Sequence, residues 1–286
     1  MAAPARSRSL ASRLGHPPVS LVVGLVIVLV VIVIAVLGPL LSPYKSTEII
    51  ASDSLLGLSA RHWFGSDDLG RDVMVRVAEG YRISLSVAVG SVLIAVLGGI
   101  PLGLVAGYFE GLIGDVIMRP LDVLMSFPAI LLGVVVMAIF GTGTVVVMLA
   151  IGIVYIPVIA RIMRASTLGT KRELFIEAVR SRGASHFRMI ALHILPNSIG
   201  PAIVQASILM GLAILLEAAL SFIGLGVRPP TPSLGLMLAS ERDFMAEAPW
   251  VVVAPGLAIM LLVLGFNLIG DGLRDRLDPR GRSRLR

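Results

Sequence analysis

The chain contains no cysteine among its 286 residues and few charged residues. Without cysteine it can form no disulfide, and metal or thiol chemistry that needs a thiolate is excluded. Charged residues make up 15% of the chain, against about 25% in an ordinary soluble domain. Hydrophobic residues make up 56%, and the mean hydropathy is +0.94. A water-soluble fold of this length could not bury so much apolar surface, so the sequence predicts an integral membrane protein.

Patterns that carry catalysis or nucleotide binding are also missing from the sequence. There is no GxxxxGK[S/T] loop to hold phosphates. The four histidines (His16, His62, His186 and His193) are scattered, and no Ser/His/Asp arrangement or zinc-binding motif accompanies them. We therefore expect no catalytic residue, no metal, no cofactor and no enzymatic activity, so that any energy from ATP must come from a partner. The net charge of +6 is better explained by membrane topology than by nucleic-acid binding.

What the sequence does have is long apolar segments. The first, Val19–Leu41, is 23 residues without a charge and would reach roughly 34 Å as a helix, enough for a hydrocarbon core of about 30 Å. Arginines precede it, as in a signal peptide, but it is longer than a signal core and no small-x-small cleavage site follows, so we expect an uncleaved anchor. Five further spans are expected at 84–107, 116–140, 144–164, 198–225 and 250–270. The predicted fold class is an all-α bundle of six transmembrane helices.

The distribution of Lys and Arg predicts the orientation of these spans. If the N-terminus is cytoplasmic, the inner segments carry 17 basic residues and the outer segments seven. Positive charges concentrate on the cytoplasmic side of a membrane protein, so both termini are expected inside the cell. The predicted organisation is a tail, first span and outer loop (1–83), a core (84–272) with an inner loop at 165–197, and a basic cytoplasmic tail (273–286).

The inner loop has the pattern of two short helices joined at Gly183. Four apolar residues recur at helical spacing on each side of it: Leu174, Phe175, Ala178 and Val179 before, and Phe187, Ile190, Ala191 and Ile194 after. Gly183 permits a left-handed turn, Ser185 can cap the second helix, and Pro196 is expected to stop it. The apolar stripe must be buried against lipid headgroups, the chain's own bundle, or a partner. A DNA-binding helix–turn–helix is disfavoured because the loop is tethered to the membrane and poor in lysine.

The same loop resembles the EAA motif of permeases in ATP-binding-cassette importers. The resemblance is carried by Glu177-Ala178-Val179, by Gly183, and by Ile194-Leu195-Pro196. Val179 departs from the small residue that is usual at its position. The resemblance implies that these seven residues belong to a coupling helix, which docks into a groove on a cytoplasmic ATPase subunit.

Three further stretches resemble the C-type permease subunit of dipeptide, oligopeptide and nickel importers. They are Phe64–Leu85, Glu217–Gly235 and Asn267–Arg280. The resemblance extends over nearly the whole chain beyond the first 15 residues or so. It implies a type I importer fold in the plasma or inner membrane of a prokaryote, and it implies that the chain forms half of a pathway for dipeptides or oligopeptides. Glutathione and nickel complexes are other solutes of similar permeases.

The resemblance also implies partners. These are a second, homologous permease subunit in a heterodimer, one or two cytoplasmic ATP-binding subunits, and an extracytoplasmic solute-binding protein, all assembled in or beside the lipid bilayer. The alternative is a self-sufficient ion-coupled transporter or channel, which would need ionisable residues within the membrane as ion sites. A membrane scaffold that does not transport would leave the coupling-like loop unexplained.

Two polar residues within the predicted spans are candidates for the substrate pathway. Glu217 would carry a charge at mid-membrane, which costs about 2.5–3.5 kcal/mol on insertion scales. It is expected either to line the solute path or to form a hydrogen-bonded tie between helices. Asn267, near the inner end of the last span, could contact a gate or mark the membrane boundary. The outer loop could contact a binding protein, but its turn residues favour folding over its own bundle.

Overall fold

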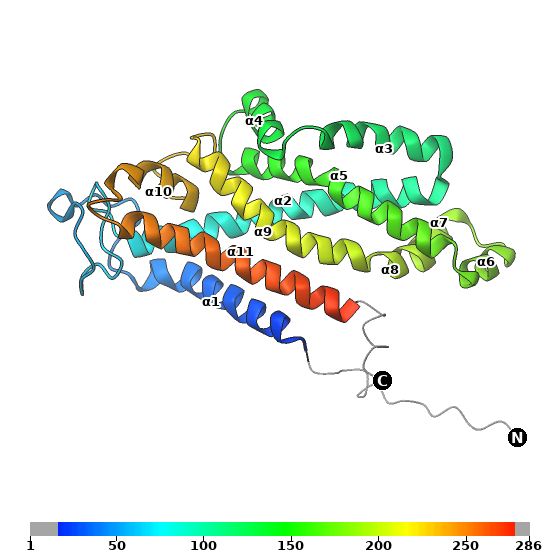
Figure 1. Cartoon of the computed structure of the whole chain (residues 1–286), viewed down its shortest axis with the longest axis horizontal. Helices are drawn as coiled ribbons and strands as arrows, with labels where there is room; N and C mark the ends of the chain where they lie inside the picture. Colours follow the sequence, from blue (N-terminus) through cyan, green and yellow to red (C-terminus); the bar gives the residue numbers. More distant parts are fainter. Residues whose placement is uncertain (1–16, 278–286) are drawn as a thin grey trace, which may run out of the picture.

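The structure, a computed structural model, describes residues 17–277 and consists mainly of helices (Figure 1). Five long helices lie along its long axis: α1 (Val19–Leu41), α2 (Val73–Phe109), α5 (Thr144–Lys171), α9 (Gly200–Phe222) and α11 (Trp250–Leu277). Each is long and apolar enough to cross a membrane. Within residues 17–277 there is no strand, so the all-α prediction is confirmed. The basic residues predicted before 17 and after 277 lie outside the described residues.

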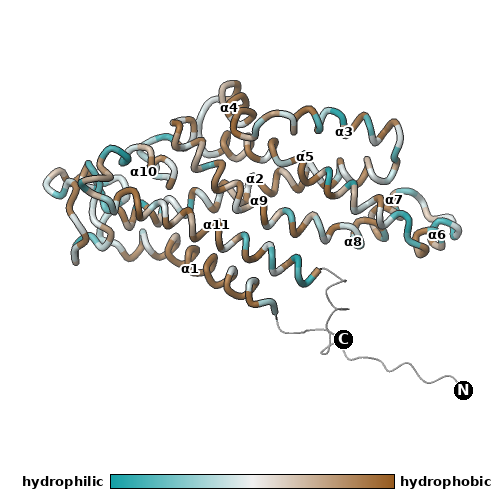
Figure 2. Tube along the Cα trace, in the orientation of Figure 1, coloured by the Kyte–Doolittle hydropathy of each residue, from teal (hydrophilic) through white to brown (hydrophobic). Residues whose placement is uncertain are grey.

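Hydrophobic residues follow the long helices, and α1 is the most uniformly hydrophobic of them (Figure 2). Both bounds of α1 agree with the sequence prediction. By contrast α5 and α11 each continue seven residues beyond their predicted ends at 164 and 270. Arg161 and Arg164 therefore lie within α5, and Arg161 pairs with Asp122 at 2.5 Å. Polar side chains that a membrane centre would exclude are tolerated where a helix leaves the bilayer.

The helix that carries the predicted second span begins before residue 84, because α2 begins at Val73. Asp72 precedes it, and its side-chain oxygen accepts a hydrogen bond from the backbone N–H of Val75 at 2.9 Å, which caps the helix. Arg76 and Glu79, predicted in the outer loop, lie on this first part of α2. The loop is therefore residues 42–72, which we call the cap.

The predicted third span, 116–140, is broken in the structure. Its residues form α3 (Gly111–Met125) and α4 (Ala129–Phe140), which are bent by 96°. Pro128 directly precedes α4, and the residue before a proline is driven out of the helical region. Figure 1 shows α4 turned across the end of α3. The bundle thus has five helices that could each span a membrane, and the bent pair α3 and α4 makes a sixth span if it is counted as one.

Glycines bring α2 and α5 into backbone contact at the centre of the bundle. Gly99, Gly103 and Gly107 lie one turn apart on α2. A Cβ at Gly99 would lie 2.8 Å from the carbonyl oxygen of Ile156, and one at Gly103 would overlap that of Ala160. Small residues at such positions allow helices to approach closely in membranes.

Glycines also determine how α1 packs. Near its start, a Cβ at Gly24 would lie 2.8 Å from the carbonyl oxygen of Gly265 on α11. Near its end, a Cβ at Gly38 would lie 2.7 Å from the Cβ of Ala78 on α2. The closest neighbour of α1 therefore changes from α11 to α2 along its length.

The short elements gather at the two ends of the bundle. At one end the cap, with its short helix η2 (Ala51–Asp53), lies beside α10 (Leu234–Glu241) and η4 (Arg242–Phe244). At the other end lie α6 (Leu174–Ser181), α7 (His186–Met189), η3 (Ile190–Ile194) and α8 (Leu195–Ser198) (Figure 1). We call residues 172–199 the end segment.

Candidate functional site

The end segment begins at residue 172 rather than at the predicted 165, because α5 continues to Lys171. Two of its local features agree with the prediction. Gly183 has a φ of +79°, in the left-handed region that favours glycine, and it separates α6 from α7. The Ser185 hydroxyl oxygen accepts a hydrogen bond from the backbone N–H of Arg188 at 3.4 Å and caps α7.

The prediction that Pro196 stops the second helix is wrong. Between α7 and α8 the chain widens into a π-helical turn, in which the N–H of Leu195 donates to the carbonyl of Ile190 five residues before it. Pro196 then falls in the first turn of α8, where its missing N–H leaves no hydrogen bond unmade. The helical path ends at Ile199 instead.

The apolar residues of the end segment include two groups, one buried in the bundle and the other exposed. Ile176, Met189 and Ile194 are buried against the last turns of α2 and α5, at Leu104 and Met163. The sequence pattern had selected only Ile194 of these three. Four other apolar residues of the segment are exposed, namely Leu174 (80%), Phe175 (42%), Phe187 (81%) and Leu192 (60%). We call these four the apolar end residues, and exposed apolar groups of this size mark contact surfaces.

The residues implied by the EAA resemblance are likewise not equivalent. Glu177, Ala178, Gly183 and Pro196 are exposed. Val179 and Leu195 are half-buried, and Ile194 is fully buried. The exposed residues can touch a partner, whereas Ile194 holds the segment to its own bundle.

A polar cluster fixes the end segment to the long helices. The Tyr108 hydroxyl, at the end of α2, lies 2.6 Å from His186 Nδ1 at the start of α7. Lys171 Nζ, at the end of α5, donates to the Tyr108 carbonyl and to Glu110 Oε1, each at 2.7 Å. The bond to Lys171 lowers the pKa of the Glu110 carboxyl. Motion of the end segment is therefore tied to α2 and α5.

The sequence analysis missed this cluster. His186 was noted only as one of four scattered histidines, and Tyr108 lies 78 residues away from it. No local pattern joins residues that far apart, so the contact follows only from the packing of α2 against α5.

Glu217 is fully buried and joins two long helices. Its Oε2 accepts a hydrogen bond from the Ser84 hydroxyl on α2 at 3.0 Å. Its Oε1 accepts one from Ser221, a turn further along α9, at 2.8 Å. Both carboxyl oxygens are thus satisfied inside the chain, which is what burial of such a group requires.

Asn267 is exposed on α11. Its side chain faces Gly211 on α9, where an added Cβ would lie 3.5 Å from its Oδ1. Glu217 is six residues further along α9, about 9 Å away along the helix. The structure does not bring the two candidate pathway residues together.

At the opposite end the cap folds over its own bundle, as the sequence favoured. Trp250 Nε1, at the start of α11, donates to the carbonyl oxygen of Ser66 at 3.1 Å. Asp67 accepts Arg71 Nε at 2.6 Å and Arg76 Nε at 3.2 Å. Since Arg76 belongs to α2, this ion pair binds the cap to the bundle, and Glu241 of α10 lies 3.8 Å from Arg71.

Stability of the cap should fall as the pH rises from about 4.5 to about 7. Burial, with Asp68 and then Asp67 nearby, raises the pKa of Glu241 to about 7, while Arg71 and Arg76 are the cations that face it. In the unfolded chain the carboxyl ionises near its ordinary value of 4.5. Below that pH the Glu241 carboxyl is protonated in both states, and the stability is fully present. Between there and about 7 the carboxyl ionises in the unfolded chain but stays protonated in the folded one, so the free energy of unfolding falls as the pH rises.

Glu241→Gln should remove this component of the pH dependence. Thermal unfolding of the purified assembly at pH 5.5, 7 and 8.5 is the measurement, and the variant should lose less stability than the native chain over this range. Glu48→Gln, at an exposed glutamate of the cap, is the matched control. Equal pH profiles for Glu241→Gln and the native chain would contradict the assignment.

Taken together, the spanning helices and the end segment define a polytopic membrane permease. The family model for the binding-protein-dependent transport system inner membrane component matches residues 99–283, and that for the N-terminal TM domain of oligopeptide transport permease C matches residues 20–57. The chain belongs to this permease family, the membrane subunits of ATP-binding-cassette importers. The family consists of membrane permease subunits rather than catalytic enzymes. They work with other permease, ATPase and solute-binding subunits.

Relatives with assigned solutes are similar over most of their length. The dipeptide transport system permease protein of Alkalihalophilus pseudofirmus is 46% identical over 245 residues, which cover 86% of this chain and 81% of that one. The glutathione transport system permease protein of Pectobacterium atrosepticum is 46% identical over 244 residues, 85% and 81% of the two chains. The di/tripeptide transport system permease protein of Pseudomonas aeruginosa is 44% identical, with 85% and 82% covered.

Solved structures confirm the fold. An inward-facing form of the MetNI methionine ABC transporter matches with a TM-score of 0.59 at 19% identity, covering 72% of this chain and 98% of that one. An amino acid ABC transporter crystallised with histidines matches with a TM-score of 0.56 at 18% identity, covering 71% and 94%. The predicted type I importer fold is therefore confirmed, and the alternative of a self-sufficient ion-coupled carrier is not supported.

Proposed function

We propose that this chain forms half of a membrane pathway for dipeptides or other short peptides. Its relatives that are named for a dipeptide, for di- and tripeptides and for glutathione all carry short peptides. In this proposal a second, homologous permease completes the pathway as a heterodimer. One or two cytoplasmic ATP-binding subunits supply the energy, and an extracytoplasmic protein delivers the solute.

The proposed orientation has the end segment and both termini in the cytoplasm. The excess of basic residues on that side, 17 against seven, supports it. The cap then faces the outside, where a solute-binding protein can approach it.

The observation that carries the coupling role is the exposure of the apolar end residues on a segment that is fixed to the bundle. Leu174 and Phe187 lie exposed. His186 contacts the Tyr108 hydroxyl at the end of α2, and Lys171 at the end of α5 donates to the Tyr108 carbonyl. A partner that buries these side chains can therefore move the long helices. ATP binding and hydrolysis in that partner would open the pathway alternately to each side.

Co-expression with the second permease and the ATP-binding subunits tests the proposal. Affinity purification through a tag on this chain should recover all of them, and peptide uptake in membrane vesicles should require ATP. If the chain purifies alone, with its fold intact and no ATP-binding subunit attached, the proposed function fails.

For Glu217 we propose a structural role, as a tie between α2 and α9. Its complete burial and its two serine partners support this role. Glu217→Gln should keep transport near the native level, because an amide can still bond both hydroxyls. Glu217→Ala leaves two buried hydroxyls without their partner, at a cost of about 1–3 kcal/mol for each group.

Thermal unfolding and peptide uptake of both variants distinguish this tie from a pathway residue. Ser86→Ala is the control, since Ser86 is exposed on α2 and its hydroxyl bonds only the carbonyl of Ile83 on its own helix. A stable Glu217→Gln variant that has lost uptake would show that the carboxylate acts on the solute.

A further inference from the structure

A wedge-shaped cavity separates α1 from α11 at the cap end of the bundle. The two helices are in close contact at Gly24 and Gly265, but further along α1 packs against Ala78 of α2 instead. The second half of α1 thus moves away from α11. The space between them has a volume of about 1080 Å³, at the upper limit of the roughly 300–1,000 Å³ of ordinary ligand pockets.

The walls of the wedge are hydrocarbon. One wall is α1 from Val33 to Leu41, the facing wall is α11 from Trp250 to Leu261, and the floor is α2 from Met74 to Tyr81. Several wall residues are also open to the surroundings, such as Leu41 (77% exposed) and Leu257 (49%). Because α1 and α11 are membrane spans, what lies against these openings in the cell is the hydrocarbon of the bilayer.

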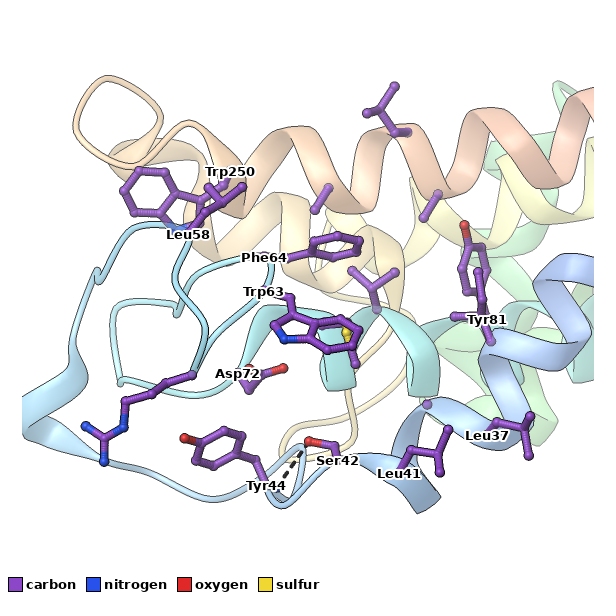
Figure 3. Close-up of a pocket in the computed structure, with 18 of the residues that line it drawn as sticks. Leu37, Leu41, Ser42, Tyr44, Leu58, Trp63, Phe64, Asp72, Tyr81 and Trp250 are labelled. Atoms are coloured by element: carbon purple, nitrogen blue, oxygen red, sulfur yellow. Dashed lines mark hydrogen bonds between the residues drawn. The ribbon is translucent and has the colours of Figure 1, made fainter.

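The cap covers the wedge with residues 58–64, and here the lining becomes aromatic and polar (Figure 3). Trp63 and Phe64 lie between the helices, with Trp250 and Tyr44 at the margins. Tryptophan and tyrosine are enriched where a membrane protein crosses the headgroup level, so this part of the wedge lies at the interface.

Two charged residues line this polar end. Asp72 lines the wedge, but its carboxyl oxygens accept from the Val75 N–H at 2.9 Å and contact His62 Nδ1 at 2.8 Å. Arg61 also lines it and is exposed. Its charge acts on Asp53, but that carboxylate is held by His62 Nε2 at 3.2 Å. A cation at the headgroup level beside an apolar cavity is complementary to a phosphate that carries acyl chains.

We propose that the wedge binds one phospholipid of the leaflet that faces the cap. The acyl chains lie between α1 and α11, and the phosphate pairs with Arg61. Where α1 leaves α11 and packs against α2, the lipid takes the place of the lost contact between α1 and α11. It thereby joins α1 to the rest of the bundle.

Native mass spectrometry of the full assembly, extracted in mild detergent, tests the proposal by counting retained phospholipids. Ala254→Phe places a ring in the wedge from the α11 wall, and Arg61→Gln removes the charge. Each should lower the count by one, whereas Arg61→Lys should keep it. The matched control is Leu97→Phe on α2, which is 66% exposed and far from the wedge along that helix, and it should also keep the native count.

A second measurement uses the native chain, in case a filled wedge impairs folding. Vesicles that contain a phospholipid with a diazirine on its acyl chain are irradiated before and after a detergent wash. Cross-links to residues 33–41 and 253–261 should form whether irradiation comes before or after the wash. Those near Leu97 should form only when irradiation comes before the wash. Equal loss at both places, equal lipid counts in the native chain and either variant, or occupation of the wedge by the second permease subunit would each overturn the proposal.

Discussion

Replacement of Leu174 and Phe187 together by aspartate should abolish binding of the ATP-binding subunit. These two side chains are 80% and 81% exposed on the end segment. Full burial of a leucine or phenylalanine is worth about 1.5–3 kcal/mol, so the loss of both should weaken the complex by about 3 kcal/mol or more, which is at least a hundredfold in Kd. Desolvation of the two introduced carboxylates adds to this loss.

The measurement is co-purification of the ATP-binding subunit, together with peptide-stimulated ATP hydrolysis by the whole assembly. Ile49→Asp is the matched control, because Ile49 is 62% exposed in the cap at the opposite end. The double variant and the Ile49→Asp variant should both insert and pair with the second permease as the native chain does. Unchanged co-purification of the double variant would contradict the proposed docking surface.

Gly103→Val should prevent the bundle from forming. A Cβ at residue 103 would overlap the carbonyl oxygen of Ala160, and a backbone atom cannot rotate away as a side chain can. The helices α2 and α5 would have to separate along the contact that Gly99 and Gly107 also require. Overpacking commonly costs about 1–3 kcal/mol, and a β-branched side chain between two backbones should exceed that range.

The expected result is loss of the folded chain from detergent extracts, measured by size-exclusion chromatography with a fluorescent fusion. Gly256→Val is the control, since Gly256 also lies inside a spanning helix but a Cβ there would meet nothing within 4 Å. If the Gly103 and Gly256 variants accumulate equally, backbone contact at Gly103 is not needed for folding.

The sequence predicted those elements whose cause is local. The span Val19–Leu41 follows from an uncharged run, and the turn at Gly183 follows from one residue type. The early start of α2 could not be found this way, because the charged residue Arg76 is held on that helix by partners in the cap, the Asp67 carboxylate and the Ser46 carbonyl. Hydropathy alone assigns such residues to a loop.

The sequence identified some residues of the candidate sites but not their partners or their burial, because these too depend on contacts between distant parts of the chain. Glu217 stood out as an acid in an apolar run, but its partner Ser84 is 133 residues away and has no distinguishing context. Periodicity identified the apolar residues of the end segment, yet it could not separate Ile194, which packs inward, from Phe187, which is exposed. That division depends on the π-helical turn, which changes which side chains face the bundle.

Helix α2 touches both ends of the molecule. Its first residues are held by the cap through Asp72 and Arg76, and its last turn carries Tyr108, which contacts the end segment. At 37 residues it is about 55 Å long, well beyond the roughly 30 Å of a hydrocarbon core. A rigid rod of that length that tilts by about 5° displaces its far end by about 5 Å. In the proposed assembly, a helix of this length would act as a lever and let a protein bound on one side of the membrane sense nucleotide on the other.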